Sequence, residues 1–185
     1  DETKMAIPDE ERLEAMQTLT RICGALETDL GVRIDVGGER TYVVDDLGRQ
    51  VPPCKLALAI ATAALRTNGG GIVAVPVTAP NTFEQVATEH GGQVLRTRNT
   101  PYALMQAATR ENVVLATDTN GAFLWPQWQP VVDGIMTVGK LLEFLTTLNL
   151  RLSELLDSVP AYHMAQTMVE CPWESKGTVM RLMNE

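Results

Sequence analysis

Apolar residues between positions 8 and 30 recur at intervals close to 3.6, the period of a helix with one buried face. The pattern is carried by Leu13, Met16, Leu19, Cys23, Leu26 and Leu30. Gly31 follows where such a helix would end. Two β-branched stretches, 32–35 and 41–44, then lead to a turn signal at 45–48. We therefore expect a helix, a strand, a loop and a second strand.

From residue 52 to residue 159, strand-length apolar runs alternate with helical patterns. The expected strands are 72–77, 94–97 and 113–116, and the expected helices are 54–66, 81–90, 102–109 and 153–159, with a further helix after 133–134 whose apolar stripe runs from 138 to 148. Asn81 and Ser153 are expected to cap the helices that they begin. Strands and helices that alternate at this spacing imply right-handed crossovers. We predict the α/β class, as a three-layer α/β/α domain whose mostly parallel sheet is covered on both faces.

Pro160 marks a boundary in the chain. Beyond it, 162–169 is expected to form a strand and Ser175 to start a short helix. One strand and one helix are too few for an independent core. We therefore predict a helix from the end of a preceding domain (1–30), an α/β domain (31–160) and the truncated start of a following domain (161–185).

Composition narrows the functional classes. The chain has 185 residues, a formal charge of −8 and a pI near 4.8, which argues against nucleic acid or an anionic membrane as a partner. The sequence contains no run of about 18 apolar residues, so we expect a soluble fragment. Three widely spaced cysteines, Cys23, Cys54 and Cys171, argue against a zinc or disulfide framework and favour the cytoplasm.

Three segments carry candidate chemistry. Asp35-Val36-Gly37-Gly38-Glu39-Arg40 and Thr117-Asp118-Thr119-Asn120-Gly121-Ala122 each follow a predicted strand, and Asp133-Gly134 precedes the helix with the strongest apolar stripe. Their order and spacing resemble the α-D-phosphohexomutase family of phosphoglucomutases and phosphomannomutases, which interconvert hexose 1- and 6-phosphates. The corresponding family motifs are Asp-Gly-Asp-Gly-Asp-Arg, Gly-Glu-x-Ser-Gly-His and Asp-Gly. The resemblance is to the third domain of the family with flanking pieces.

The first segment stands where the family binds a metal ion, which implies metal ligands at Asp35 and Glu39. Gly37 replaces one family Asp, and Glu39 is longer than the Asp that it replaces. Because Mg²⁺ requires oxygen ligands in near-octahedral geometry, Mg²⁺ is possible in the parent protein and doubtful here. The alternative is a tight turn in which Gly37 and Gly38 have positive φ and Arg40 pairs with a nearby acid.

The second segment stands where the family reads sugar hydroxyls. The resemblance implies a substrate-binding set consisting of Arg40, Asp118, Asn120 and Gly121. Ligands of open α/β sheets gather at the carboxyl ends of strands, and a carboxylate can accept from vicinal hydroxyls. The same residues also make an ordinary turn, which a hairpin into 122–125 would need in any case. Trp125 and Trp128 either stack on a sugar or cover a sheet edge or a domain boundary, and we favour the second interpretation.

The nucleophile and the phosphate clamp of the family are not expected in this chain. In the family, a phosphoserine in the first domain transfers its phosphate and the fourth domain clamps the substrate. None of the three serines, Ser153, Ser158 and Ser175, lies in a loop that resembles the phosphoserine motif. We therefore predict no catalytic residue and no mutase activity for the chain alone.

The segment 171–181, Cys-Pro-Trp-Glu-Ser-Lys-Gly-Thr-Val-Met-Arg, resembles the subgroup in which a sugar-nucleotide pyrophosphorylase domain of the mannose-1-phosphate guanylyltransferase type is fused ahead of a mutase-like region. The expected partners are a hexose phosphate or the remaining domains of the parent, and an oligomer is possible. Three hypotheses stay open: a mutase-like module that has lost its chemistry, which we favour, part of an active mutase with an altered metal site, and an unrelated α/β binding domain.

Overall fold

A computed structural model describes residues 9–165, 167 and 169–183. Its helices are α1 (Asp9–Leu26), α2 (Pro53–Asn68), α3 (Thr82–Glu89), α4 (Pro101–Ala108), α5 (Gly134–Leu148), α6 (Leu152–Asp157) and α7 (Lys176–Met183), the last preceded by a 3₁₀ turn at Trp173–Ser175. Its strands are β1 (Gly31–Ile34), β2 (Thr41–Val44), β3 (Gly71–Pro76), β4 (Gly92–Thr97), β5 (Val113–Thr117), β6 (Phe123–Trp125) and β7 (Gln129–Val132). None of the described helices is long and apolar enough to cross a membrane.

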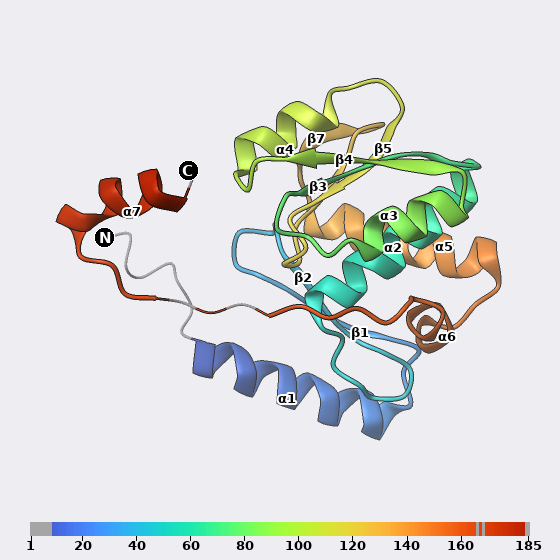
Figure 1. Cartoon of the computed structure of the whole chain (residues 1–185). Coiled ribbons are helices and arrows are strands. Elements are labelled where there is room, and N and C mark those ends of the chain that lie inside the picture. Colours follow the sequence, from blue (N-terminus) through green and yellow to red (C-terminus); the bar gives the residue numbers. More distant parts are fainter. Residues whose placement is uncertain (1–8, 166, 168, 184–185) are drawn as a thin grey trace.

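The central sheet has five strands in the order β4-β3-β5-β6-β7. Strand β3 pairs in parallel with both β4 and β5, and β6 and β7 add to the β5 edge as antiparallel strands. The chain moves from β3 to β4 in one direction and from β4 to β5 in the other. Right-handed connections therefore place α3 and α4 on opposite faces (Figure 1).

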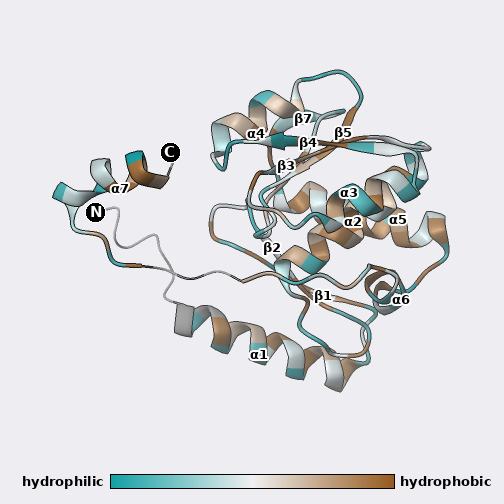
Figure 2. Ribbon diagram, viewed as in Figure 1, coloured by the Kyte–Doolittle hydropathy of each residue, from teal (hydrophilic) through white to brown (hydrophobic). Residues whose placement is uncertain are grey.

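The two faces of the sheet have separate cores. One is filled by α2, α3, α5 and α6 and contains Phe83, Phe123 and Phe144; the other lies under α4 and contains Leu104 and Leu124. Figure 2 shows the hydrophobic colouring concentrated on the helices inside the body. These layers confirm the predicted α/β class with helices on both faces of a mostly parallel sheet.

Glycines end α2 and set the start of β3. Gly69 closes the helix in the left-handed conformation at φ 69°. Gly70 and Gly71 have φ of 116° and 118°, and a Cβ at Gly70 would stand 2.5 Å from the carbonyl oxygen of Gly91. Only glycine combines a positive φ with so little space for a side chain. The predicted helix stop therefore also allows the loop before β3 to approach the loop at Gly91 closely.

Strands β1 and β2 form a separate antiparallel pair. Helix α1 covers this pair through a small cluster of Met16, Cys23 and Val44. An isolated β-bridge between Arg40 and Ala122 joins the pair to the turn after β5. The amphipathic pattern correctly predicted α1, whereas the sequence did not indicate that its buried face serves the β1–β2 pair and not the central sheet.

Strand β7 was not predicted, and the two tryptophans beside it have different environments. Trp125 is 1% exposed, stands 5.9 Å from Phe144 between ring centroids and donates its indole N–H to Thr137 Oγ1 at 3.1 Å. Trp128 is 64% exposed. Trp125 is therefore a core residue and is not available to stack on a sugar.

Three local predictions were wrong. The described residues of 162–169 form no strand and have no regular secondary structure. Ser153 does not cap a helix, because α6 begins at Leu152 and the Ser153 hydroxyl donates to Asp46 Oδ2 at 2.8 Å. Asn81 precedes α3 without a capping side-chain hydrogen bond. The Ser153 hydroxyl thus bonds to Asp46 of a distant turn and not to the backbone of its own helix.

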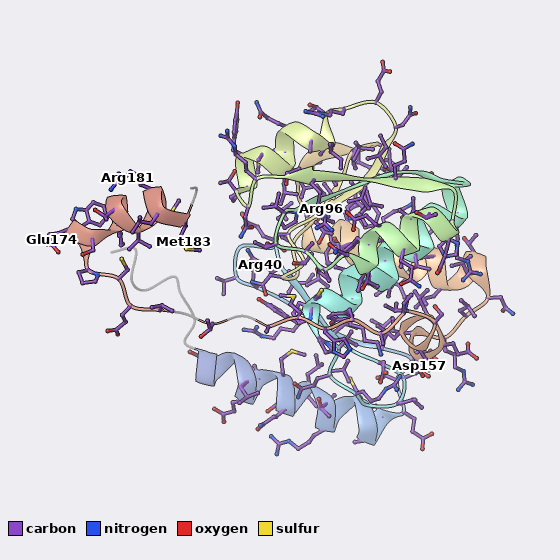
Figure 3. The ribbon with its side chains drawn as sticks, viewed as in Figure 1. Arg40, Arg96, Asp157, Glu174, Arg181 and Met183 are labelled. Carbon is purple, nitrogen blue, oxygen red and sulfur yellow. The ribbon has the colours of Figure 1, made fainter. Side chains whose placement is uncertain are left out.

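The C-terminal segment leaves the body after residue 165. Figure 1 shows α7 lying apart from the layered body, and Figure 3 labels Glu174, Arg181 and Met183 on this separate part. None of the residues of α7 is buried. The predicted helix after Ser175 is therefore present, and its assignment to a following domain stays a prediction.

Candidate functional site

A cavity of about 540 Å³ lies at the carboxyl ends of the parallel strands. The loops after β3, β4 and β5 contribute Thr78, Asn99 and residues 118–120, and the C-terminal segment contributes Met164 and Ala165. Because parallel strands end at one edge of the sheet, their loops meet there. The volume lies in the range of small-molecule sites, so this cavity is the candidate site.

The loop after β5 is shaped by the carboxylate of Asp118. Its Oδ1 accepts from the backbone N–H groups of Asn120 at 2.7 Å and Ala122 at 3.1 Å. Gly121 has φ 95°, and a Cβ there would stand 3.2 Å from the carbonyl oxygen of Thr41. The loop is therefore a tight turn that leads into β6, as its sequence predicted, and its shape depends on the acid and on the glycine.

The loop after β1 is a second turn of the same kind. Asp35 Oδ1 accepts from the backbone N–H groups of Glu39 at 2.8 Å and Arg40 at 3.1 Å. Gly38 has φ 74°, whereas Gly37 is not in the positive-φ region. The alternative of a tight turn thus describes this loop, with one glycine in the left-handed conformation where the sequence suggested two.

Arg40 joins the two turns. Its Nη1 donates to Asp118 Oδ2 at 2.8 Å and to the carbonyl oxygen of Asn120 at 2.6 Å. We call this set of Arg40, Asp118 and Asn120 the clasp; Figure 3 labels Arg40 where it extends from the β1–β2 connection. The clasp brings together three of the four predicted substrate residues, and Gly121 adjoins them through its carbonyl oxygen, which accepts from Thr41 N at 2.9 Å.

The start of α5 is attached to the same place. Asp133 Oδ1 caps the helix by accepting from Met136 N at 2.8 Å. Gly134 donates its N–H to the carbonyl oxygen of Gly38 at 2.8 Å, and a Cβ at Gly134 would stand at that same distance from the oxygen. The Asp-Gly step thus allows α5 to begin directly against the first turn, so the three segments lie together in the structure.

The fit to a magnesium ion is poor. Among the described residues, no group of three or more His, Cys, Asp or Glu side chains could hold a metal ion. One carboxylate oxygen of Asp35 already accepts hydrogen bonds from two backbone N–H groups. One of these belongs to Glu39, so Glu39 contacts Asp35 through its backbone and not through its carboxylate. The loop therefore lacks the set of convergent oxygen ligands that Mg²⁺ requires.

The cavity offers several groups to a ligand with hydroxyls. A carboxylate oxygen accepts about two hydrogen bonds, so Asp118 Oδ2, which accepts one from Arg40, can accept one more. Thr78, Asn99 and Asn120 also line the cavity with polar side chains. Sequence reasoning did not single out Thr78 or Met164. Thr78 could have been found from its position just after an apolar strand, because ligands bind at the carboxyl ends of strands. No sequence signal pointed to Met164, because its segment was predicted to be a strand.

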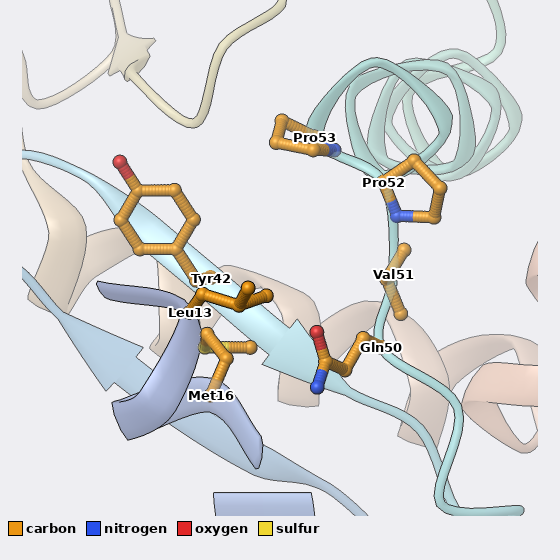
Figure 4. Close-up of a pocket in the computed structure, with 7 residues that line it drawn as sticks. All are labelled: Leu13, Met16, Tyr42, Gln50, Val51, Pro52 and Pro53. Carbon is orange, nitrogen blue, oxygen red and sulfur yellow. The ribbon is translucent and has the colours of Figure 1, made fainter. Parts of the chain in front are cut away.

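A second cavity of about 320 Å³ lies between α1 and the segment before α2 (Figure 4). It is lined mainly by apolar side chains, among them Leu13, Met16, Val51 and two prolines, together with Tyr42 and Gln50. No charged side chain of the described residues lines it. It lies where α1 packs on β2, so we interpret it as a packing gap and not as a chemical site.

Comparison with known proteins decides the family. The family model described as "Phosphoglucomutase/phosphomannomutase, alpha/beta/alpha domain III" matches residues 53–162. The chain belongs to this phosphohexomutase family. That finding excludes the hypothesis of an unrelated α/β domain and confirms the resemblance to a third domain.

Curated relatives match nearly the whole chain. A phosphoglucomutase/phosphomannomutase of Thermococcus kodakarensis is 28% identical over 95% of this chain. A probable phosphoglucosamine mutase of Methanopyrus kandleri is 30% identical over 94% of it. The chain spans 38% of the length of each of these proteins. It therefore corresponds to a part of the length of these relatives.

Solved structures show the same fold. A phosphoglucomutase/phosphomannomutase family protein of Burkholderia thailandensis has a TM-score of 0.69 and 25% identity, covering 80% of this chain and 32% of its own. A putative phosphomannomutase of Thermus thermophilus has a TM-score of 0.65 and 20% identity over 70% of this chain and 30% of its own. The layered body is thus the phosphohexomutase arrangement.

Proposed function

We propose that this chain is a phosphohexomutase third domain that binds the sugar ring of a hexose phosphate weakly and has no mutase chemistry of its own. The observation that carries the proposal is the clasp, in which Arg40 and Asp118 satisfy each other. The turn holds hydrogen-bonding groups in place for sugar hydroxyls, yet the charges of Arg40 and Asp118 are already paired with each other. Few contacts remain to offset the entropy of association, so we expect millimolar affinity at best.

The absence of chemistry is supported by the surroundings of two serines. The Ser153 hydroxyl donates to Asp46, and the Ser158 hydroxyl donates to the carbonyl oxygen of Leu155 at 2.7 Å. Neither is placed as a phosphate carrier. Phosphoryl transfer depends on positioning and on neutralisation of developing charge, and the turn at Asp35 and Glu39 supports at most a weak site for Mg²⁺. The nucleophile, the metal and the phosphate clamp would have to come from other domains.

The context of the domain is part of the same proposal. Residues 1–30 and 161–185 belong to a preceding and a following domain, and the resemblance of residues 171–181 supports a nucleotidyltransferase fused upstream. The partners are then a hexose phosphate and the other domains of the parent. The three cysteines carry free thiols, which suits the reducing cytoplasm.

A second candidate is a domain of an active mutase with altered metal geometry. It is favoured by the relatives that are described as mutases and that match almost the whole chain. The first candidate instead makes the domain a regulatory or assembly module. The full-length reading frame separates them, since an upstream phosphoserine loop supports the active enzyme and its absence supports the module.

Binding is tested by titrating mannose 1-phosphate into ¹⁵N-labelled chain. We expect amide shifts at residues 78, 99 and 117–122, with smaller shifts in Asp118→Asn. Asp29→Asn removes the same charge at a position outside this cavity and serves as the control. If no amide of 117–122 shifts at high millimolar ligand, the loop is only a turn. Turnover of mannose 1-phosphate with its bisphosphate activator by the purified chain would contradict the absence of chemistry.

A further inference from the structure

A separate cleft of about 370 Å³ lies between the edge strand β4 and helix α4. Three arginines line it, Arg96, Arg98 and Arg110, and none of its lining residues in the described part of the chain is acidic. This is unusual for a chain with 23 acidic and 15 basic residues. The cleft is therefore a local positive region on a negatively charged molecule.

Arg96 forms the wall of the cleft and is fully engaged. Its Nε and Nη2 donate to the two carboxylate oxygens of Glu84 at 2.7 and 2.6 Å. Its Nη1 and Nη2 also donate to backbone carbonyl oxygens at the end of β3 and in the loop before α3, at 2.8 to 3.3 Å. Its charge is balanced by Glu84, so Arg96 holds α3 and the loop in place and does not provide a free cation.

Arg98 and Arg110 are different. Both are exposed, and within the described part of the chain neither side chain makes a hydrogen bond or an ion pair. Arg98 follows the end of β4 and Arg110 follows the end of α4. Glu111, the neighbour of Arg110, does not line the cleft. Two guanidinium groups thus line the cleft without a compensating carboxylate.

Neutral hydrogen-bonding groups complete the lining. Thr100 and Tyr102 carry hydroxyls at the start of α4. The Tyr102 oxygen accepts from Gln106 Nε2 at 2.8 Å, which leaves its O–H free to donate. The Thr100 hydroxyl oxygen accepts from Ala103 N at 3.2 Å and can likewise still donate. Guanidinium and hydroxyl donors around one cleft suit an oxyanion that accepts several hydrogen bonds.

We propose that the β4–α4 cleft binds the phosphate group of a phosphate monoester through Arg98 and Arg110. The site is distinct from the cavity beside Asp118, which contains an acid and no cation among its described lining residues. The two adjoin at one loop, where Arg98 and Thr100 line the cleft and Asn99 lines the cavity. The proposal goes beyond ring binding and does not depend on it.

The test uses ¹⁵N-labelled chain with inorganic phosphate, mannose 1-phosphate and mannose in separate titrations at low salt. We expect phosphate to shift amides of residues 95–98 and 100–110 in a saturable way, and mannose to leave these amides unchanged. Arg98→Gln and Arg110→Gln should each weaken phosphate binding about threefold or more, as expected for an exposed ion pair. Arg66→Gln removes an exposed arginine outside the cleft and should leave the affinity unchanged.

Mannose 1-phosphate distinguishes the two sites. Shifts at 95–98 and 100–110 without shifts at 117–122 would support the phosphate site and contradict ring binding, whereas the reverse result would overturn the phosphate site alone. Equal weakening by Arg66→Gln, or phosphate shifts that spread over the surface without saturation, would also overturn it, because both results indicate a general effect of charge.

Discussion

Tyr162 and Cys54 attach the C-terminal segment to the first turn of α2. Burial raises the pKa of the Cys54 thiol, and a hydrogen bond from Tyr162 partly opposes that rise. The pKa of Tyr162 is raised to about 12 by burial, by the negative charge of a Cys54 thiolate and by their hydrogen bond. Tyr162 also packs against the main core. Folding therefore favours the protonated, neutral forms of both side chains.

The raised pKa of Tyr162 predicts a loss of stability in alkali. The unfolded chain ionises this tyrosine near 10.0, and the folded chain only at about 12. The contribution of Tyr162 is therefore fully present below about pH 10 and falls as the pH rises through this window. Urea unfolding at about pH 9 and about pH 11 should show a smaller pH dependence in Tyr162→Phe than in the original chain.

The control for this prediction is Tyr102→Phe. Tyr102 is 69% exposed, so Tyr102→Phe removes a tyrosine hydroxyl at the surface and not one packed against the core. An equal reduction of the pH dependence in both variants would contradict the role of Tyr162.

At the scale of elements, α6 is held by an acid from a distant turn. Asp46 Oδ1 accepts from Ser153 N and Oδ2 accepts from the Ser153 hydroxyl, both at 2.8 Å. Burial alone would raise the pKa of Asp46, but the two hydrogen bonds from Ser153, with smaller contributions from its own backbone and Arg151, outweigh it and the pKa is lowered from 3.8. Asp46 thus performs the capping role that the sequence assigned to Ser153.

Asp46→Ala should lower the free energy of unfolding by about 1–2 kcal/mol at neutral pH, the usual cost of losing a cap. Because the folded pKa is depressed, this stabilisation is present above pH 3.8 and is lost as the pH falls through the lower folded value. The difference between the variant and the original chain in urea unfolding should therefore shrink in acid. Glu111→Ala, at an exposed position, should show no such difference; a constant difference at all pH values would contradict the assignment.

At the scale of the whole molecule, burial ends well before the C-terminus. The largest fully buried side chains lie between Leu56 and Leu152. Val159 is still buried and Tyr162 still contacts the core, whereas α7 has no buried residue. The body and α7 should therefore contribute very differently to stability.

Two truncations test this division. Removal of residues 166–185 should change the free energy of unfolding by less than about 0.5 kcal/mol, as for most surface changes. Removal from residue 159 onward should lower it by ~2 kcal/mol or more, because Val159 and Tyr162 leave the core. Equal losses in urea unfolding of the two variants would show that the C-terminal segment stabilises the body through contacts beyond Tyr162.

Local pattern determined much of this protein. The helix stripes, the apolar strand runs and the glycine stops predicted nearly every element of the body, because hydrophobic periodicity and left-handed turns are properties of neighbouring residues. The turn at 118–121 and a pairing of Arg40 with some acid could also be inferred. Strand β7 could not, since Gln129–Val132 is short and alternates between exposed and half-buried positions.

Only the tertiary structure decided which distant groups meet. It assigned Asp118 to Arg40 across 78 residues and Asp46 to Ser153 across 107. It also brought Met164 to the cavity, and Arg98 and Arg110 to one cleft. A side chain with several possible partners has no preferred one until the sheet order and the helix layers fix its neighbours. The sequence therefore specified the loops and their chemistry, and the packing of the sheet specified the sites.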